Sequence, residues 1–238
     1  MKALIFDCDG VLVDTERDGH RVAFNRTFAD FGLNIDWDDA LYADLLQVGG
    51  GKERMTYYFN QYGWPQSDLP KEAFIKKLHA KKTDCFSNLI AEGALPLRKG
   101  VTRIVDEAIA ANITLAVCST SNIKSVTTVV ETLLGSDRRE QFSIFAGDMA
   151  KKKKPDPEIY NLAKTHLNLE GYKCVVIEDS RNGLLAAKAA GMSCLVTKSA
   201  YTGNEDFAEA DMVCDDLGEP PENHVQLRDL IGLCQQVQ

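Results

Sequence analysis

The sequence predicts an α/β fold: an open, doubly wound parallel sheet with a small all-helical domain inserted after the first strand. From residue 93 onward, short apolar runs alternate with helical periodicity, and no hairpin signal separates them. Residues 15–92 show helical periodicity only. We therefore expect a core domain of residues 1–14 and 93–238 and a helical cap domain of residues 15–92. The insertion point predicts that the cap forms a lid above the carboxyl end of the first strand.

The elements follow in order from the apolar pattern. Residues 4–6 are apolar throughout, as in a strand buried within a parallel sheet. In the cap, aromatic and aliphatic side chains recur at helical spacing between glycine-rich breaks, which predicts four helices whose aromatic stripes form the cap's own core. Further strands are predicted at 113–118, 142–146, 174–177, 192–196 and 210–214, and further helices at 101–109, 126–134, 157–167, 184–190 and 227–234. Right-handed crossovers then place helices on both faces of the sheet.

Composition argues against several classes of protein. The net charge of -8 is unfavourable for nucleic-acid or anionic-membrane partners, and no apolar stretch is long enough to span a membrane. The seven cysteines are odd in number and form no C-x-x-C pair, so we expect buried thiols in a reducing compartment rather than disulfides or zinc. Because Met1 leads almost directly into the first strand, we expect no signal or transit peptide within this numbering.

Polar residues stand at or after the ends of four predicted strands. In chain order they are Asp7 and Asp9, Ser119, Lys154, and Glu178 with Asp179. Each has an ordinary alternative, such as a helix N-cap, a solvated loop lysine or a polar strand end. However, ligands of such sheets bind beyond the carboxyl ends of the strands, where all of these residues are expected to meet. Their coincidence favours one shared site.

The set has the groups that phosphoryl transfer requires. Asp7 is the expected nucleophile, forming an aspartyl-phosphate, and Lys154 is expected to balance the crowded carboxylates. Ser119 and the backbone N–H groups at the start of the next helix are expected to bind phosphoryl oxygens. Asp9 keeps its carboxyl group free for general acid and base work.

The expected cofactor is Mg2+. Gly10 permits a tight turn that aims the Asp9 carbonyl and the Asp7 side chain at a common point. Asp179 is expected as a further ligand, and Glu178 as a direct or water-mediated one. The cation would neutralise charge on the transferring group.

These motifs resemble those of the haloacid dehalogenase superfamily of phosphotransferases. The matching stretches are Asp7-Cys8-Asp9-Gly10-Val11, Ser119, Lys154-Pro155-Asp156-Pro157, and Glu178-Asp179-Ser180 followed by Gly183. Within that superfamily the chain resembles the group of β-phosphoglucomutase and the CbbY phosphatases, and Gly49-Gly50-Gly51-Lys52-Glu53-Arg54-Met55 is most similar to CbbY. The resemblance implies a Rossmann-like core and a Mg2+-dependent phosphatase acting on xylulose 1,5-bisphosphate, an inhibitory by-product of Rubisco in the Calvin cycle.

The resemblance also implies roles for cap residues. Lys52 and Arg54 are expected to bind the distal phosphate, and Gly50 and Gly51 to let the substrate approach closely. For Asp14, Glu16 and His20, contacts to sugar hydroxyls and contacts to the cap's own basic residues are both open. Ser121 and Asn122 are expected to serve either the phosphoryl group or the sugar. We expect a monomer whose partner is a sugar bisphosphate, in the plastid stroma for a plant or algal chain and in the cytoplasm for a bacterial one.

Other functions are weighed against this one. A sugar-phosphate mutase uses the same core but returns the phosphoryl group to the substrate, and it stays open. A haloacid dehalogenase has no use for an acid two residues after the nucleophile, so Asp9 counts against it. A signalling receiver, which also uses a phospho-accepting aspartate, would be about half as long.

Overall fold

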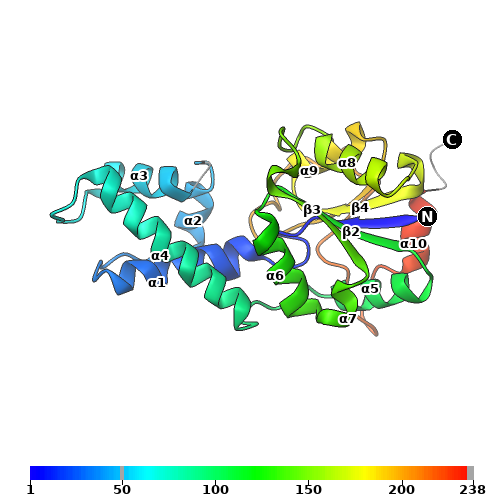
Figure 1. Cartoon of the computed structure of the whole chain (residues 1–238), viewed down its shortest axis with the longest axis horizontal. Coiled ribbons are helices and arrows are strands. Elements are labelled where there is room, and N and C mark those ends of the chain that lie inside the picture. Colours follow the sequence, from blue (N-terminus) through cyan, green and yellow to red (C-terminus); the bar gives the residue numbers. More distant parts are fainter. Residues whose placement is uncertain (49–50, 235–238) are drawn as a thin grey trace. The chain divides into compact units, whose positions relative to one another are not determined.

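The computed structural model describes residues 1–48 and 51–234, and the chain divides into two compact units (Figure 1). The α/β unit comprises Met1–Thr15 and Leu95–Gln238, and the helical unit comprises Glu16–Ala94. The first boundary lies one residue, and the second two residues, beyond the predicted boundaries at 14/15 and 92/93. Among the described residues, no helix is both long and apolar enough to cross a membrane.

Within the described residues, the α/β unit contains one six-stranded sheet in the order β3-β2-β1-β4-β5-β6. Its strands are β1 (Ala3–Phe6), β2 (Thr114–Ser119), β3 (Phe142–Ala146), β4 (Cys174–Glu178), β5 (Ser193–Thr197) and β6 (Met212–Cys214). Neighbouring strands are parallel throughout, which confirms the predicted doubly wound sheet. The chain runs outward from β1 to β3 and then returns to β4 on the other side of β1. The strand order therefore switches between β1 and β4, where ligands of such sheets bind.

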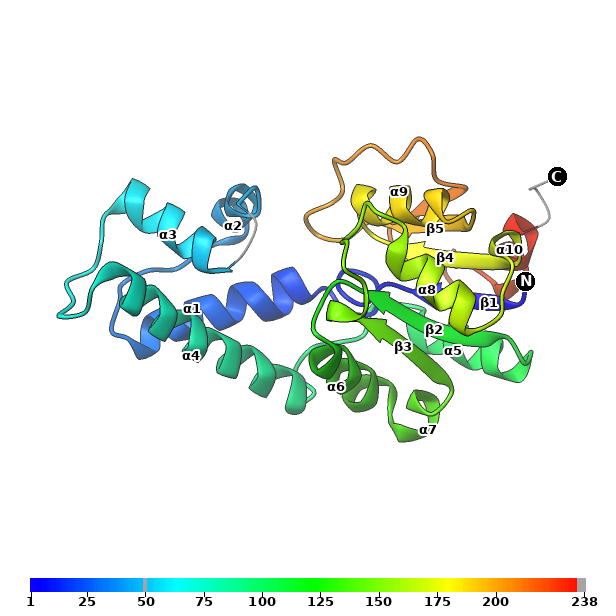
Figure 2. The same cartoon turned by 45° about the horizontal axis from the view of Figure 1, so that its top comes forward.

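Helices cover both faces of this sheet, as predicted (Figures 1 and 2). They are α5 (Val101–Ala110), α6 (Ile123–Leu134), α7 (Ser136–Arg139), α8 (Glu158–His166), α9 (Arg181–Ala189) and α10 (Leu227–Leu233), with short 3-10 turns η2 (Gly147–Met149) and η3 (Gly171–Lys173). Ala3 and Ile5 of β1 share a buried cluster with residues of α8 and α9. Because side chains alternate along a strand, Leu4 and Phe6 face the opposite side, which α5 and α10 cover. The short helix α7 was not predicted.

The helical unit contains the four predicted helices. They are α1 (Val22–Asp30), α2 (Asp39–Leu45), α3 (Gly51–Tyr62) and α4 (Lys71–Ala91), preceded by a π-helical segment η1 (Thr15–Arg21). The aromatic stripes form this unit's own core, as predicted: the Trp37 ring centroid lies 4.7 Å from that of Phe24 and 4.9 Å from that of Phe28. Trp37, Phe24 and Phe28 are fully buried.

Candidate active site

The loop after β1, which carries Asp7 and Asp9, lies close to Asp179 at the end of β4. Asp7 still pairs with the sheet, because its backbone N–H donates to the Ile177 carbonyl at 2.9 Å. The chain then turns at Gly10, which has a φ of +81°. A Cβ atom on Gly10 would lie 2.0 Å from Asp179 Oδ2, so a side chain here would collide with the acid. Glycine therefore lets the loop after β1 approach the end of β4.

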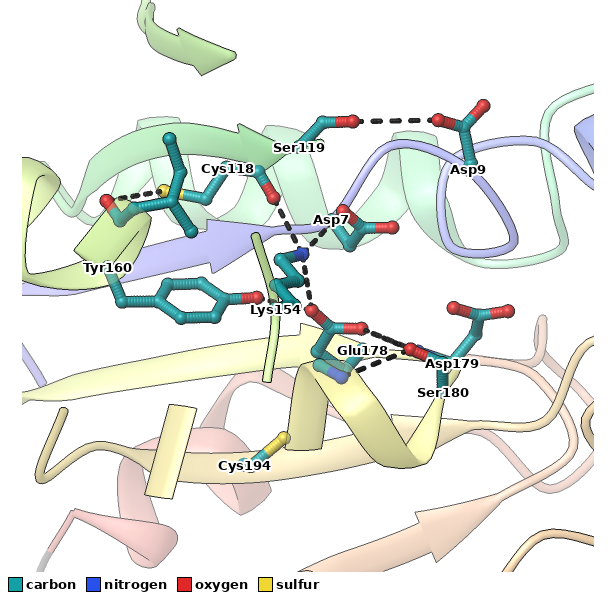
Figure 3. Close-up of polar contacts among 12 residues, drawn as sticks. Asp7, Asp9, Cys118, Ser119, Lys154, Tyr160, Glu178, Asp179, Ser180 and Cys194 are labelled. Atoms are coloured by element: carbon teal, nitrogen blue, oxygen red, sulfur yellow. Dashed lines mark hydrogen bonds and ion pairs between the residues drawn. The ribbon is translucent and has the colours of Figure 1, made fainter. Parts of the chain in front are cut away.

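The Lys154 ammonium group lies between the ends of three strands, β1, β2 and β4. Its ammonium group donates to Asp7 Oδ1 at 2.7 Å, to Glu178 Oε1 at 2.6 Å and to the Cys118 carbonyl at 2.9 Å. Figure 3 shows Lys154 reaching between Asp7 and Glu178. Its side chain is only 7% exposed, so water screens these ion pairs weakly. The neighbouring Lys153 instead donates to the Gly147 carbonyl at 2.7 Å.

Glu178 is held from two further sides. The Tyr160 hydroxyl, on α8, donates to Glu178 Oε1. A Cβ atom on Gly183 would lie 1.9 Å from Glu178 Oε2, so glycine at the start of α9 makes room for the carboxylate. Ser180 accepts a hydrogen bond from the Gly183 N–H at 3.2 Å and caps α9, which is the ordinary role of serine at this position.

Burial and crowding shift the pKa values of these groups. Burial raises the pKa of Asp7 to about 7, Lys154 opposes this shift, and Glu178 and Asp9 add to it. Burial also raises the pKa of Asp179, and the charges of Asp7 and Glu178 raise it further. For Lys154, burial favours the neutral amine, but Asp7 and Glu178 outweigh burial and raise its pKa. The ammonium ion is thus locked in its charged form between the acids.

The same acids fit a divalent cation. Ligand oxygens of Asp7, Glu178 and Asp179 all lie within 4.8 Å of one another, and all three residues are buried. Lys154 pairs with two of these three carboxylates, so the cluster carries more negative than positive charge when all three are ionised. Carboxylate oxygens are hard ligands of the kind that bind Mg2+ in proteins. Three of the four predicted ligands are therefore brought together through their side chains.

Asp9, the fourth predicted ligand, turns its carboxylate toward three hydroxyl groups. Oδ1 accepts a hydrogen bond from Thr15 at 2.7 Å, and Oδ2 accepts one from Ser121 at 2.5 Å and one from Ser119 at 3.5 Å. Figure 3 shows the Asp9 carboxylate facing Ser119. The carboxyl group is thus separate from the Asp7–Glu178–Asp179 cluster, as its predicted acid and base role requires.

Two predicted substrate residues of the α/β unit have local structural partners. Asp14 Oδ2 accepts a hydrogen bond from the Ala200 N–H at 3.1 Å, and the Asp14 side chain is buried. Asn122 Oδ1 accepts one from the Lys124 N–H at 2.9 Å and caps α6. The N-cap of α6 is therefore Asn122, which leaves the hydroxyls of Ser119 and Ser121 to Asp9.

In the helical unit, Glu16 and Arg54 contact each other and Tyr42. The Tyr42 hydroxyl donates to Glu16 Oε2 at 2.6 Å, and Arg54 Nη1 donates to the Tyr42 hydroxyl at 2.8 Å and lies 3.8 Å from Glu16 Oε2. Arg54 Nε donates to the Leu45 carbonyl at 3.1 Å, and Arg54 is buried. Of the two contacts open for Glu16, the structure shows the one to a basic residue of its own unit.

His20 likewise lies against a basic residue of the helical unit. Its Nδ1 is 2.8 Å from Lys82 Nζ, and its ring centroid is 3.9 Å from that of Phe86. Burial lowers the pKa of His20 well below its usual value, and the charges of Lys82 and Arg54 lower it further. His20 is therefore neutral, and its Nδ1 accepts a hydrogen bond from the Lys82 ammonium group.

The glycine-rich stretch before α3 is described from Gly51 onward, and Gly50 lies outside the described residues. A Cβ atom on Gly51 would come within 3.1 Å of the His79 ring, so the helix begins in close contact with α4. Lys52 is exposed and lines a cavity of about 420 Å3 within the helical unit. The other lining residues are Thr56, Asn60, Trp64, Lys71, Glu72, Ile75 and Lys76.

Sequence reasoning missed Thr15 and Tyr160, which hold Asp9 and Glu178. Thr15 stands directly after the predicted loop, six residues beyond Asp9, so its hydroxyl group was a usable signal. Tyr160 belongs to the apolar face of a predicted helix, where a core position is the ordinary expectation, and no local pattern marks its hydroxyl group.

Comparison with known proteins gives the family. The model of the haloacid dehalogenase-like hydrolases matches residues 1–191, which is most of the chain. A curated relative from Arabidopsis thaliana, "CBBY-like protein", is 57% identical over 94% of this chain and 72% of its own. The chain belongs to the haloacid dehalogenase-like hydrolases. Because relatives in this family of hydrolases are named as phosphatases, we conclude that the chain is a phosphatase.

Solved structures of family members agree with the fold. CbbY from Rhodobacter sphaeroides in complex with phosphate is 40% identical, with a TM-score of 0.78, and the match covers 97% of this chain and 99% of that one. A mutant of the same protein in complex with xylulose-(1,5)bisphosphate gives a TM-score of 0.77 at the same identity and coverage. A putative β-phosphoglucomutase from Thermotoga maritima is 26% identical, with a TM-score of 0.72 and full coverage of both chains. Both groups named by the sequence resemblance are thus found among the structural neighbours.

Proposed function

We propose that this chain is a Mg2+-dependent phosphatase that removes a phosphoryl group from xylulose 1,5-bisphosphate through an aspartyl-phosphate on Asp7. The observation that carries the proposal is the buried ion-paired set in which Lys154 Nζ lies 2.7 Å from Asp7 and 2.6 Å from Glu178, with Asp179 beside them. The substrate is supported by the similarity to CbbY, which has been solved with that bisphosphate.

Asp7 supplies the nucleophile. Lys154 hydrogen-bonds Oδ1, which leaves Oδ2 as the oxygen that attacks phosphorus. A phosphorus–oxygen bond forms to Asp7 while the bond to the sugar oxygen breaks, giving an acyl phosphate and splitting one displacement into two easier ones. Lys154 stays charged throughout and offsets the negative charge of the neighbouring acids.

Asp9 moves the protons. In the first step it donates a proton to the departing sugar oxygen, and in the second it takes one from the water that attacks the aspartyl-phosphate. Thr15 and Ser121 hold its two carboxyl oxygens in place. A hydroxyl group both donates and accepts hydrogen bonds, so these residues hold Asp9 in either protonation state.

Asp7, Glu178, Asp179 and the carbonyl of Asp9 would hold Mg2+, because the three buried carboxylates, once ionised, exceed the single positive charge of Lys154 and need a further cation. When bound, the cation supplies charge neutralisation for the transferring phosphoryl group. Ser119 and the N–H groups that open α6 are proposed to bind phosphoryl oxygens, since a helix N-terminus favours anions.

For the distal phosphate, the exposed Lys52 is the better of the two predicted residues, because Arg54 is buried and already bonded to Tyr42 and Leu45. Glu16 and His20 are proposed to support the substrate region through Arg54 and Lys82 rather than by touching the sugar. A monomeric state, and a plastid stromal location for a plant or algal chain, remain proposals. The plant relative supports the location.

The test is phosphate release from a panel of sugar phosphates with and without Mg2+. The panel comprises xylulose 1,5-bisphosphate, ribulose 1,5-bisphosphate, xylulose 5-phosphate and glucose 1-phosphate. We expect stoichiometric inorganic phosphate from the first compound, the highest kcat/KM there, and loss of activity on chelation. Isomerised sugar phosphate without released phosphate would instead support the mutase, which the similarity to β-phosphoglucomutase keeps as the second candidate.

A further inference from the structure

Arg98 lies where the chain re-enters the α/β unit, just ahead of α5. Its backbone N–H donates to the Leu12 carbonyl at 2.9 Å, and Leu97 forms an antiparallel bridge with Val13. The segment that contains Arg98 is therefore paired along its backbone with the loop that follows Asp7 and Asp9. None of the roles assigned above uses this arginine.

The Arg98 guanidinium group binds oxygen atoms at or beyond the ends of three strands, β1, β5 and β6. Nη1 donates to the Gly10 carbonyl and, at 3.1 Å, to the carbonyl and to the hydroxyl of Thr197 at the end of β5. Nη2 donates to the carbonyls of Lys198 and Asp215, each at 2.5 Å. A single planar group thus ties the turn after β1 to the chain beyond β5 and β6.

Two of these partners, Gly10 and Thr197, lie next to Asp179 and Glu178 of the acid cluster. The Gly10 turn lies so close to Asp179 that a Cβ atom there would be 2.0 Å from Oδ2. The Thr197 hydroxyl lies 3.5 Å from the Glu178 carbonyl, to which it donates. Burial lowers the pKa of Arg98, and the negative charges of Asp14 and Asp179 oppose that shift, so the guanidinium group also interacts electrostatically with Asp179.

We propose that Arg98 is a positioning residue that sets the spacing of the cation ligands. It holds the Gly10 turn against β5 and β6, and it thereby fixes the Asp9 carbonyl relative to Asp179. It is not a catalytic residue, because its partners are backbone oxygens and the Thr197 hydroxyl. The inference rests on the proposed function only in taking Mg2+ as the cofactor, and it holds whatever the substrate is.

Lysine cannot replace arginine in this role. The guanidinium group presents five N–H donors in a rigid plane, whereas an ammonium group presents three donors at one point. An ammonium group near Gly10 therefore cannot also bind the carbonyls of Lys198 and Asp215. Arg98→Lys keeps the positive charge and removes the geometry, which makes it the informative variant.

Arg103 provides a matched control. It lies in the same unit, on α5, and its Nη2 donates to the carbonyls of Leu217 and Gly218 at 2.9 Å each, yet it has no contact with the acid cluster among the described residues. Arg103→Lys thus breaks arginine–carbonyl bonds of the same kind away from the site. Both substitutions are expected to lower Tm.

The experiment measures Mg2+ binding to the wild-type chain and the two variants by calorimetric titration and by the rise in Tm with added Mg2+. We expect Arg98→Lys to weaken Mg2+ binding by about 10- to 100-fold, the usual effect of losing a residue that orients metal ligands, and Arg103→Lys to bind as the wild type does. In activity assays, Arg98→Lys raises the Mg2+ concentration for half-maximal rate while KM for the sugar phosphate is unchanged at saturating Mg2+.

A second variant keeps the test decisive if Arg98→Lys fails to fold. Thr197→Val removes one acceptor of Arg98 and the link to Glu178 with little change in volume, and it should weaken Mg2+ binding in the same direction by less. Wild-type Mg2+ affinity in either folded Arg98→Lys or Thr197→Val, or an equal loss in Arg103→Lys, overturns the proposal. If the wild type binds Mg2+ but releases no phosphate from xylulose 1,5-bisphosphate, the proposed substrate is wrong while the role of Arg98 is unaffected.

Discussion

The two units of this chain bury charged side chains for different ends. In the α/β unit, Lys154, Asp7 and Glu178 are drawn from three distant segments and face one another at the carboxyl edge of the sheet. In the helical unit, buried Arg54 bonds to Tyr42 and the Leu45 carbonyl, so its charge is satisfied within its own fold. The exposed Lys52 is a better candidate for recognition there. Catalysis is thus expected to depend on buried charges in the α/β unit, and recognition of the distal phosphate on an exposed charge in the helical unit.

The largest effect is expected for Asp7→Asn. An amide cannot form the acyl phosphate, so kcat should fall by roughly 10^4-fold or more, as for other lost nucleophiles. Phosphate release under saturating substrate measures this. Asp106→Asn is the control, because Asp106 is exposed and paired with Arg138 in the same unit. Substantial turnover by Asp7→Asn would remove the basis for placing the chemistry in the α/β unit.

Asp9→Asn is expected to have the next largest effect. The amide cannot donate or take the catalytic proton, so kcat should fall by about 10^2- to 10^4-fold, while binding of vanadate as a phosphate analogue survives. Thr15 and Ser121 can still hold the side chain through hydrogen bonds. Retained phosphatase activity in a variant that binds vanadate normally would exclude the acid and base role.

In the helical unit, Lys52→Gln should raise KM for a sugar bisphosphate by about 10-fold, because one charged hydrogen bond to the distal phosphate is lost. KM for a monophosphate should not change, and neither should Tm. Lys77→Gln is the control, since Lys77 is exposed on α4 and lies outside the cavity that Lys52 lines. An equal rise in KM for mono- and bisphosphates would show that Lys52 does not bind the distal phosphate.

Arg54→Gln tests the complementary expectation, that the buried Arg54 contributes to stability and not to substrate binding. Its loss removes two hydrogen bonds from a buried site, one to the Tyr42 hydroxyl and one to the Leu45 carbonyl, so the free energy of unfolding should fall by about 1–3 kcal/mol. Urea denaturation of the full chain measures this. An unchanged free energy of unfolding together with a raised KM would show that Arg54 binds the substrate, as Lys52 is proposed to do.

The smallest effect is a pH dependence. In the folded, metal-free protein the pKa of Asp7 is raised from 3.8 to about 7, chiefly by burial. The folded chain therefore binds an extra proton between these values, and this group's contribution to stability falls as pH rises through that window. Mg2+ competes with the same proton, so the rise in Tm at fixed Mg2+ should be larger at about pH 8 than at about pH 6. A pH-independent rise would contradict Asp7 as a ligand.

The edge of the sheet was predictable because its geometry follows from strand order alone. Asp7 directly follows a buried strand, Ser119 and Glu178 each end one, and neighbouring parallel strands end at one edge of the sheet. Lys154 was predictable as a lysine held at a proline turn. The contacts of Arg98 were not, since its partner Gly10 lies 88 residues away and backbone carbonyls leave no mark in a sequence.

The cap was less predictable for a related reason. Lys52 and Arg54 are two residues apart on one helix, and only the packing of α3 decides that one is exposed and the other buried. Asn122 and Ser121 are neighbours as well, yet one caps α6 and the other binds Asp9. Residue type identified the candidates, and side-chain direction separated them.

The most direct test of the central claim is chemical trapping of the intermediate during a single turnover. Wild-type protein with Mg2+ and limiting xylulose 1,5-bisphosphate is quenched in acid within milliseconds, reduced with borohydride and mapped by mass spectrometry. An aspartyl-phosphate is reduced to homoserine, and we expect that conversion at Asp7 in a substrate-dependent amount. Normal phosphate release with Asp7 unmodified, or with the modification at another acid, would contradict the proposed chemistry.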